Sequence, residues 1–170
     1  MRKLSDTSVK NKTVALRADL IVPVKEGIIL DDARIEAVIP TVKYLLTQNC
    51  KIILISHFGR PKAGTFDPQA SLQPIATRIG EMLNHEVDFI SAIKDVKFKN
   101  TISLLENTRF LSGELENNEE LSKNLGSMAE VYVFDAFGTA HREQASTFGA
   151  IYQANVSCAG LLLEAEIEAL

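Results

Sequence analysis

Short runs of apolar residues recur along the chain, separated by longer stretches with helical periodicity. Each run is continuous rather than alternating and consists mainly of β-branched or large apolar residues. This is typical of strands buried on both faces of a parallel sheet. The clear runs are residues 14–16, 52–55, 102–105 and 131–134, and a weaker one is 87–90. The pattern therefore predicts a parallel sheet of four or five strands.

The stretches between these runs predict helices. From Asp32 to Leu46, apolar residues repeat at spacings of three and four and trace one helix face. Pro40 lies inside this stretch and is expected to kink or split the helix near Ile39. Further helices are predicted over about 72–83, 119–128 and 160–170.

Strands that alternate with helices form βαβ units, whose helices pack on a parallel sheet. We therefore predict a single α/β domain over residues 1–170, with a three-layer Rossmann-like fold. Its parallel sheet is covered by helices on both faces. Residues 66–69 and 113–118 are predicted to be surface loops.

Composition adds limits on function. The 170 residues are 46% hydrophobic and 24% charged, as in ordinary globular domains, and the net charge of -4 argues against nucleic-acid binding. A small anionic ligand remains compatible, because it responds to local charge. No apolar run approaches the ~18 residues that a membrane span needs. We expect a soluble, cytoplasmic protein with no nucleic-acid or membrane partner.

Several familiar sites are missing from the sequence. Cys50 and Cys158 form no CxxC motif, so each is expected to be a small buried apolar residue. The chain has no P-loop, no GxGxxG, no HExxH and no GxSxG. We therefore predict no metal site and no nucleotide-phosphate loop in this chain.

Arginines gather at the predicted strand ends. Of the seven arginines, four stand at or just past the end of a run, and Arg34 opens the first helix; the four are Arg17, Arg60, Arg109 and Arg142. Carboxyl ends of parallel strands share one edge of the sheet. We therefore expect the guanidinium groups to converge on one cleft, where their planar forks would bind carboxylate or phosphate. The alternative for each one is an ordinary pairing with surface acids.

Three other polar residues occupy the same segments, and each has a structural alternative to a role in binding. Asp19 either contacts a ligand or orients a neighbouring arginine. His57 either contacts a ligand or is a hydrogen-bonded structural histidine. Asp135 either acts chemically or accepts hydrogen bonds from backbone amides or an arginine.

Taken together, these segments resemble the phosphoglycerate kinase family. The matching motifs are SHFGRPK (56–62), RADLIVP (17–23), LENTRF (105–110) followed by GE, and DAFGTAHREQAST (135–147). Arg34-Ile35-Glu36 and Pro40-Thr41 also match. Order and spacing agree from about residue 4 to 170, so the resemblance covers essentially the whole chain.

The resemblance implies the N-terminal domain of such a kinase, which binds 3-phosphoglycerate or 1,3-bisphosphoglycerate for reversible glycolytic phosphoryl transfer. Mg-ADP or Mg-ATP would bind a C-terminal domain that we expect to be absent here, and the parent enzyme is usually a monomer. The implied substrate-binding residues are Asp19, Leu20, Ile21, Arg34, His57, Phe58, Gly59, Arg60, Arg109 and Arg142. Arg34 would also be catalytic, stabilising charge on the transferred phosphoryl group.

One departure from the family falls on this set. The family usually has Asn at the position of Ile21, and Ile cannot donate or accept a hydrogen bond. A lost contact of this kind costs roughly 1–3 kcal/mol, a factor of about 5 to 150 in affinity.

Two functional hypotheses follow. The first is the substrate-binding half of a phosphoglycerate kinase, with negligible turnover by itself. The second is a non-catalytic anion-binding or interaction domain derived from that kinase, which would not prefer 3-phosphoglycerate over phosphate. An unrelated hydrolase that uses His57 or Asp135 would require the motif match to be accidental.

Overall fold

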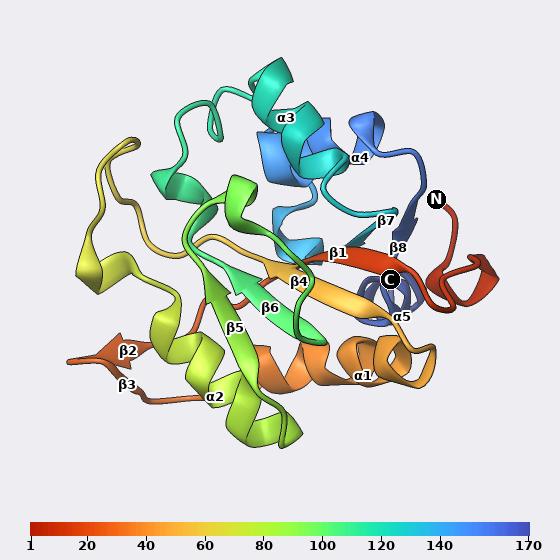
Figure 1. The fold of residues 1–170 in the computed structure, drawn as a ribbon, viewed down its shortest axis with the longest axis horizontal. Helices are drawn as coiled ribbons and strands as arrows, with labels where there is room; N and C mark the ends of the chain where they lie inside the picture. Colours follow the sequence, from red (N-terminus) through yellow and green to blue (C-terminus); the bar gives the residue numbers. More distant parts are fainter.

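A parallel β-sheet forms the centre of the molecule. The computed structural model describes residues 1–170. Its six main strands are β1 (Thr13–Ala18), β4 (Lys51–Ile55), β5 (Val87–Ile90), β6 (Ile102–Leu105), β7 (Val131–Asp135) and β8 (Ser157–Ala159). They are ordered β5-β6-β4-β1-β7-β8, and every neighbouring pair is parallel (Figure 1). All five predicted strands are confirmed, and β8 is an additional edge strand.

Helices cover both faces of this sheet, which confirms the three-layer α/β fold. They are α1 (Ala33–Thr47), α2 (Gln73–Leu83), α3 (Glu119–Gly126), α4 (Ala150–Gln153) and α5 (Leu161–Glu168). Side chains alternate along each strand. Leu16 and Leu54 therefore pack in one cluster with α1 and α2, while Ala15 and Ile53 pack in another with α3 and α4. Helix α5 lies beside α1 (Figure 1).

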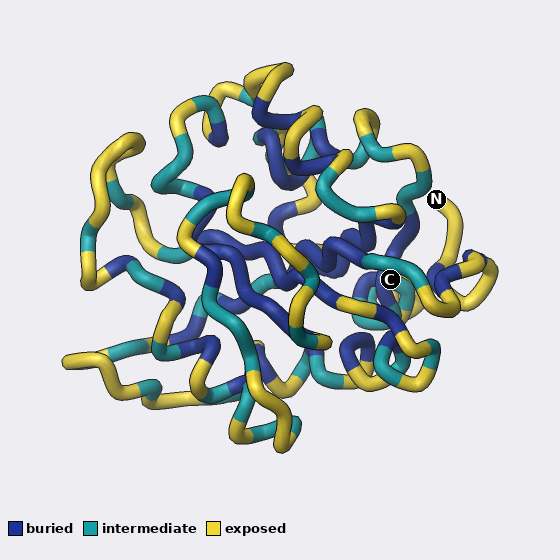
Figure 2. Tube along the Cα trace, viewed as in Figure 1, coloured by how far each residue is buried: buried dark blue, intermediate teal, exposed yellow.

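The interior is mainly apolar and lies on both faces of the sheet. Buried residues run along the central strands, whereas exposed residues lie in the loops and on the outer helix faces (Figure 2). Cys50 and Cys158 are both buried free thiols, as predicted. None of the helices combines the length and the apolar character required to span a bilayer.

The predicted split at Pro40 is not found, because α1 continues through it to Thr47. Proline leaves the carbonyl four residues earlier without its helical partner. That carbonyl belongs to Glu36, and both Glu36 and Pro40 lie on the exposed side of α1. Water can bond the freed carbonyl there, so the helix continues.

Some local structure was not predicted. A hairpin joins β2 (Val24–Lys25) to β3 (Ile28–Ile29) through Glu26 and Gly27, both of which have positive φ. Two-residue strands are too short to show any periodicity. The segment 113–118, predicted as a surface loop, holds a buried residue, Glu114, which is only 1% exposed. Its carboxylate accepts hydrogen bonds from the backbone and hydroxyl of Ser146.

Candidate functional site

An open cleft of about 600 Å³ lies at the carboxyl edge of the sheet. The segments that follow β1, β4, β6 and β7 all contribute to its wall, as the parallel topology requires. Its lining residues are Ile21, His57, Gly59, Arg60, Pro61, Arg109, Leu115, Arg142 and Gln144. Of the four arginines expected at the strand ends, three line this cleft.

These three arginines have no acidic partners. Arg60, Arg109 and Arg142 form no salt bridge, although the same molecule pairs Arg34 and Arg78 with acids. Burial, and then the positive charges of Arg142 and other arginines, lower the pKa of Arg109. The cleft therefore concentrates cations that repel one another, and a bound anion would relieve that repulsion.

A side-chain bridge positions Arg109. Asn107 accepts hydrogen bonds from the backbone amides of Phe58 (3.1 Å) and Arg109 (3.0 Å) and donates to the Phe58 carbonyl at 2.6 Å. It thus joins the loops that follow β4 and β6. Arg109 Nη1 donates to the Gly59 carbonyl at 2.6 Å, while its buried Nε has no hydrogen-bond partner. This guanidinium is fixed in place but keeps an unused donor.

His57 is almost completely buried at 2% exposure, yet it lines the cleft. Its Nδ1 lies 2.8 Å from Nη2 of Arg17. Burial, reinforced by the charges of Arg17 and Arg109, lowers the pKa of His57 to about 2. The imidazole is therefore neutral at physiological pH.

Arg17 does not face the cleft, contrary to the expectation that all four strand-end arginines would converge there. It is fully buried, and its Nε donates to Ser146 Oγ at 2.9 Å. In β1 it points to the same side as Ala15, where α3 packs. Its side chain therefore remains inside the protein.

Asp19 and Arg34 form an ion pair and do not line the cleft themselves. Asp19 also accepts a hydrogen bond from the backbone amide of Ile21 at 3.1 Å. The ion pair places Asp19 to orient Arg34, and its contact with a ligand stays a prediction. Arg34 remains more than half exposed, with 56% of its side-chain surface accessible.

The remaining predicted residues lie in the cleft, in the core or beside a neighbouring cavity. Gly59 and Ile21 line the cleft, and Ile21 places an apolar side chain among its polar groups. Leu20 is fully buried in the main core, so its side chain cannot reach a ligand. Phe58 is half-buried and faces a neighbouring cavity together with Val24 and Pro74. Gln144, which lies in the 135–147 motif but was not predicted to be a site residue, lines the cleft two residues after Arg142.

Asp135 lies away from the cleft, on the face covered by α1 and α5. It is fully buried and accepts hydrogen bonds from Thr41 Oγ1 (2.6 Å) and the Leu163 amide (2.8 Å). Burial raises the pKa of its carboxyl group. Of the two alternatives for Asp135, these contacts match the structural acceptor, and its buried carboxyl group does not line the cleft.

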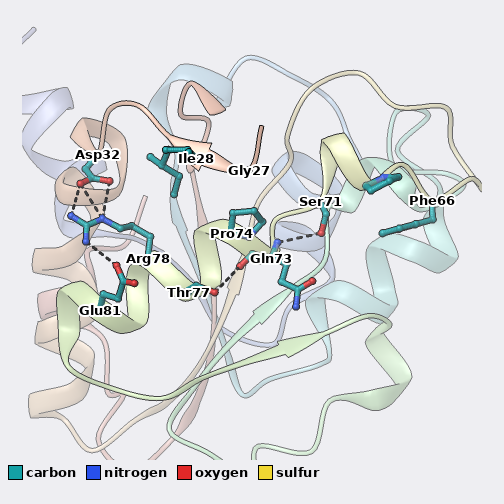
Figure 3. A pocket seen from close by; sticks show the side chains of 12 residues that line it. Gly27, Ile28, Asp32, Phe66, Ser71, Gln73, Pro74, Thr77, Arg78 and Glu81 are labelled. Carbon is teal, nitrogen blue, oxygen red and sulfur yellow. Dashed lines mark hydrogen bonds and ion pairs between the residues drawn. The ribbon is translucent and has the colours of Figure 1, made fainter. Parts of the chain in front are cut away.

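A second, larger cavity of about 800 Å³ lies between the β2–β3 hairpin and α2 (Figure 3). Its cation, Arg78, is fully engaged. The guanidinium contacts Asp32 at 2.7 Å and Glu81 at 3.0 Å. This cavity therefore offers no free positive charge, despite its size.

Comparison with known proteins gives a consistent result. A family model described as phosphoglycerate kinase matches residues 4–170. The phosphoglycerate kinases of Desulfovibrio desulfuricans and Francisella tularensis subsp. novicida are each 46% identical over 98% of this chain. The chain spans only 43% of the length of each of these relatives.

Solved structures agree with the sequence matches. The structure of phosphoglycerate kinase from Coxiella burnetii aligns with 98% of the chain at a TM-score of 0.94 and 41% identity. That of Pyrococcus horikoshii OT3 aligns with 99% at a TM-score of 0.85 and 35% identity. The chain covers 43% and 44% of those two proteins, respectively.

Proposed function

The chain belongs to the phosphoglycerate kinase family, and from that premise we propose that its arginine-lined cleft binds 3-phosphoglycerate or 1,3-bisphosphoglycerate. One observation carries the proposal. Arg60, Arg109 and Arg142 meet at the carboxyl edge of the sheet without acidic partners. A ligand with one phosphate and one carboxylate offers acceptors for several guanidinium groups at once.

In this proposal each residue of the cleft contacts a different part of the substrate, and Asp19 holds Arg34 at the edge of the cleft. Arg60, Arg109 and Arg142 bind the anionic oxygens, and Gly59 lets the backbone approach them closely. Arg34 stabilises the phosphoryl group as it moves between the substrate carboxylate and a nucleotide. Phosphoryl transfer depends mainly on such positioning and charge stabilisation.

The family also implies a magnesium nucleotide, which in this proposal binds outside these 170 residues. The 170 residues contain no group of three or more His, Cys, Asp or Glu side chains suited to a metal ion, and no phosphate-binding loop motif. We therefore expect a polypeptide of only these residues to bind the carbon substrate without turnover. Normal specific activity of that polypeptide in a coupled assay with ATP would contradict this expectation.

The binding proposal is tested by calorimetric titration with 3-phosphoglycerate at low salt, because screening weakens exposed charge interactions. We expect saturable binding that is tighter than for inorganic phosphate and weaker in Arg34→Ala. Equal binding of both ligands would instead support the alternative, a non-catalytic anion-binding domain. The observation that favours this alternative is Ile21, which lines the cleft where the family usually has Asn.

A further inference from the structure

A chain of buried polar side chains ends at the cleft. Glu114 accepts from Ser146 Oγ at 2.8 Å and from the Ser146 amide at 2.7 Å. Ser146 in turn accepts from Arg17 Nε at 2.9 Å, and Arg17 Nη2 reaches His57 Nδ1 at 2.8 Å. All four residues are at most 2% exposed. Only His57, the last of them, lines the cleft.

The direction of the hydrogen bonds is fixed by chemistry. A guanidinium group can only donate, so Nδ1 of His57 must accept from Arg17. In a neutral imidazole, the proton then lies on the other ring nitrogen, Nε2. Nε2 has no hydrogen-bond partner in the protein, and it is not one of the fully buried polar atoms that lack a partner. His57 therefore has a free N–H donor.

The surroundings of the ring oppose a positive charge on it. Arg17 lies behind His57, and the charges of Arg109, Arg142 and Arg34 also act on it. No carboxylate contacts the imidazole, because Asp19 pairs with Arg34 and Glu114 bonds to Ser146. Protonating the ring would add another cation to this group.

The Arg17 guanidinium is held at three nitrogens. Besides Ser146 and His57, it donates through Nη1 to the Ala18 carbonyl at 2.6 Å. Glu114 offsets its charge through Ser146. A lysine has no planar fork and cannot reproduce these three directions. The plane of the guanidinium, and with it the position of the imidazole, is set from the interior.

We propose that Arg17 is a positioning residue that, backed by Ser146 and Glu114, fixes His57 as the neutral Nε2–H tautomer. The ring then donates one hydrogen bond to an anionic oxygen in the cleft and takes no part in proton transfer. The identity of the ligand that carries this oxygen rests on the proposed function. The tautomer and its control by Arg17 do not depend on that ligand.

The test is long-range ¹H–¹⁵N NMR of the histidine rings in the ligand-free chain, titrated from about pH 8 to about pH 5, the range in which an ordinary histidine changes charge. We expect His57 to show only the Nε2–H tautomer throughout. The urea-unfolded chain is the positive control, because its histidines titrate near their unperturbed pKa of about 6.5. A wild-type His57 that titrates in this range, or that carries its proton on Nδ1, overturns the proposal.

Arg17→Met removes the donors but keeps much of the side-chain length, and Arg17→Lys keeps the charge. In both variants we expect His57 to show mixed tautomers or to titrate within the range. Ser146→Ala retains Arg17 but removes the hydroxyl that accepts its Nε hydrogen bond. It is the milder variant, with the same expected change at His57, if the other two fail to fold. A folded Arg17 variant with an unchanged, pure Nε2–H signal overturns the positioning role.

Addition of 3-phosphoglycerate distinguishes this inference from the proposed function. A shift of the Nε2–H signal on binding supports both. If the predicted tautomer is present but the ligand does not bind, the proposed substrate is wrong and the positioning role of Arg17 stands. If the ligand binds and the tautomer is not the predicted one, only the inference about Arg17 fails.

Discussion

The two cavities of this domain differ in how their arginines are neutralised. The larger one, beneath the β2–β3 hairpin, contains Arg78, which is bound to Asp32 and Glu81. The smaller cleft at the carboxyl edge has several arginines and no acidic partner for those that line it. Volume alone would select the first cavity, whereas unused charge selects the second.

The difference arises from where the acids point. Near the cleft, Asp19 is paired with Arg34 at the edge, and Glu114 is turned inward to Ser146. In the other cavity, Asp32 and Glu81 approach Arg78 from the start of α1 and from α2 itself. The fold thus places no acid beside the arginines of the cleft, whereas two acids contact the arginine of the larger cavity. An anion is therefore expected in the cleft.

The largest expected effect comes from the acid that is turned inward. Glu114 acts on Arg17 through Ser146, and Glu114→Gln removes the main acidic group that offsets the buried charge of Arg17. Leaving a buried charge uncompensated costs roughly 3–5 kcal/mol, to be measured as the free energy of unfolding in urea. Glu116→Gln, an exposed neighbour, is the matched control and should leave stability nearly unchanged. Equal stability of the two variants would show that Glu114 does not compensate Arg17.

Removing one arginine from each cavity tests most directly whether arginines without acidic partners bind the ligand. Arg109→Ala should weaken 3-phosphoglycerate binding by about 1.5–3 kcal/mol, the usual value of hydrogen bonds to charged groups. This corresponds to a loss of affinity of roughly 10- to 150-fold. Arg78→Ala should leave affinity unchanged, because Arg78 is already paired. Calorimetric titration of both variants with 3-phosphoglycerate measures these affinities. A similar loss of affinity in both would show that the two cavities do not differ in ligand binding.

Ile21→Asn sharpens the same comparison by adding a polar group to the cleft. We expect affinity for 3-phosphoglycerate to rise by roughly 1–3 kcal/mol, the usual cost of a missing contact of this kind. Ile21→Leu is the control, since it changes shape without adding a hydrogen bond. An unchanged affinity in Ile21→Asn would mean that the ligand does not approach this position.

The effect that is smallest near neutral pH is a dependence of stability on pH. Because the pKa of His57 is lowered to about 2 in the folded state and is about 6.5 when unfolded, only the unfolded chain takes up this proton below pH 6.5. Stability should therefore fall with falling pH, and His57 accounts for about 1.4 kcal/mol per pH unit of that fall. In His57→Gln the slope of unfolding free energy against pH should be smaller by that amount. Parallel slopes would contradict a buried neutral histidine.

Sequence patterns predicted the elements that repeat and missed those fixed by single contacts. The four strong apolar runs became strands, because burial on both faces demands continuous apolar residues. The weak run became β5, an edge strand that is only partly buried. The edge strand β8 has three residues and no such signal. Whether Pro40 interrupts α1 depended on which side of the helix faced water, a property of packing that propensity does not contain.

The candidate site was likewise predicted only in part. Parallel topology brings the strand-end segments together, so the positions of Arg60, Arg109 and Arg142 along the chain were enough to predict one shared cleft. The inward position of Arg17 was not predicted, because its partner Ser146 lies 129 residues away in the sequence and is in turn bonded to Glu114. Buried polar networks join segments that are distant in the sequence, so local sequence patterns do not predict them.

Amide NMR of the ¹⁵N-labelled chain during titration with 3-phosphoglycerate most directly tests the claim that unpaired arginines mark the site. We predict saturable shifts at Gly59, Arg109 and Arg142, with no change at Gly27 or Thr77, which line the larger cavity. Shifts centred on Thr77 and Gly27, with the cleft unaffected, would contradict the account.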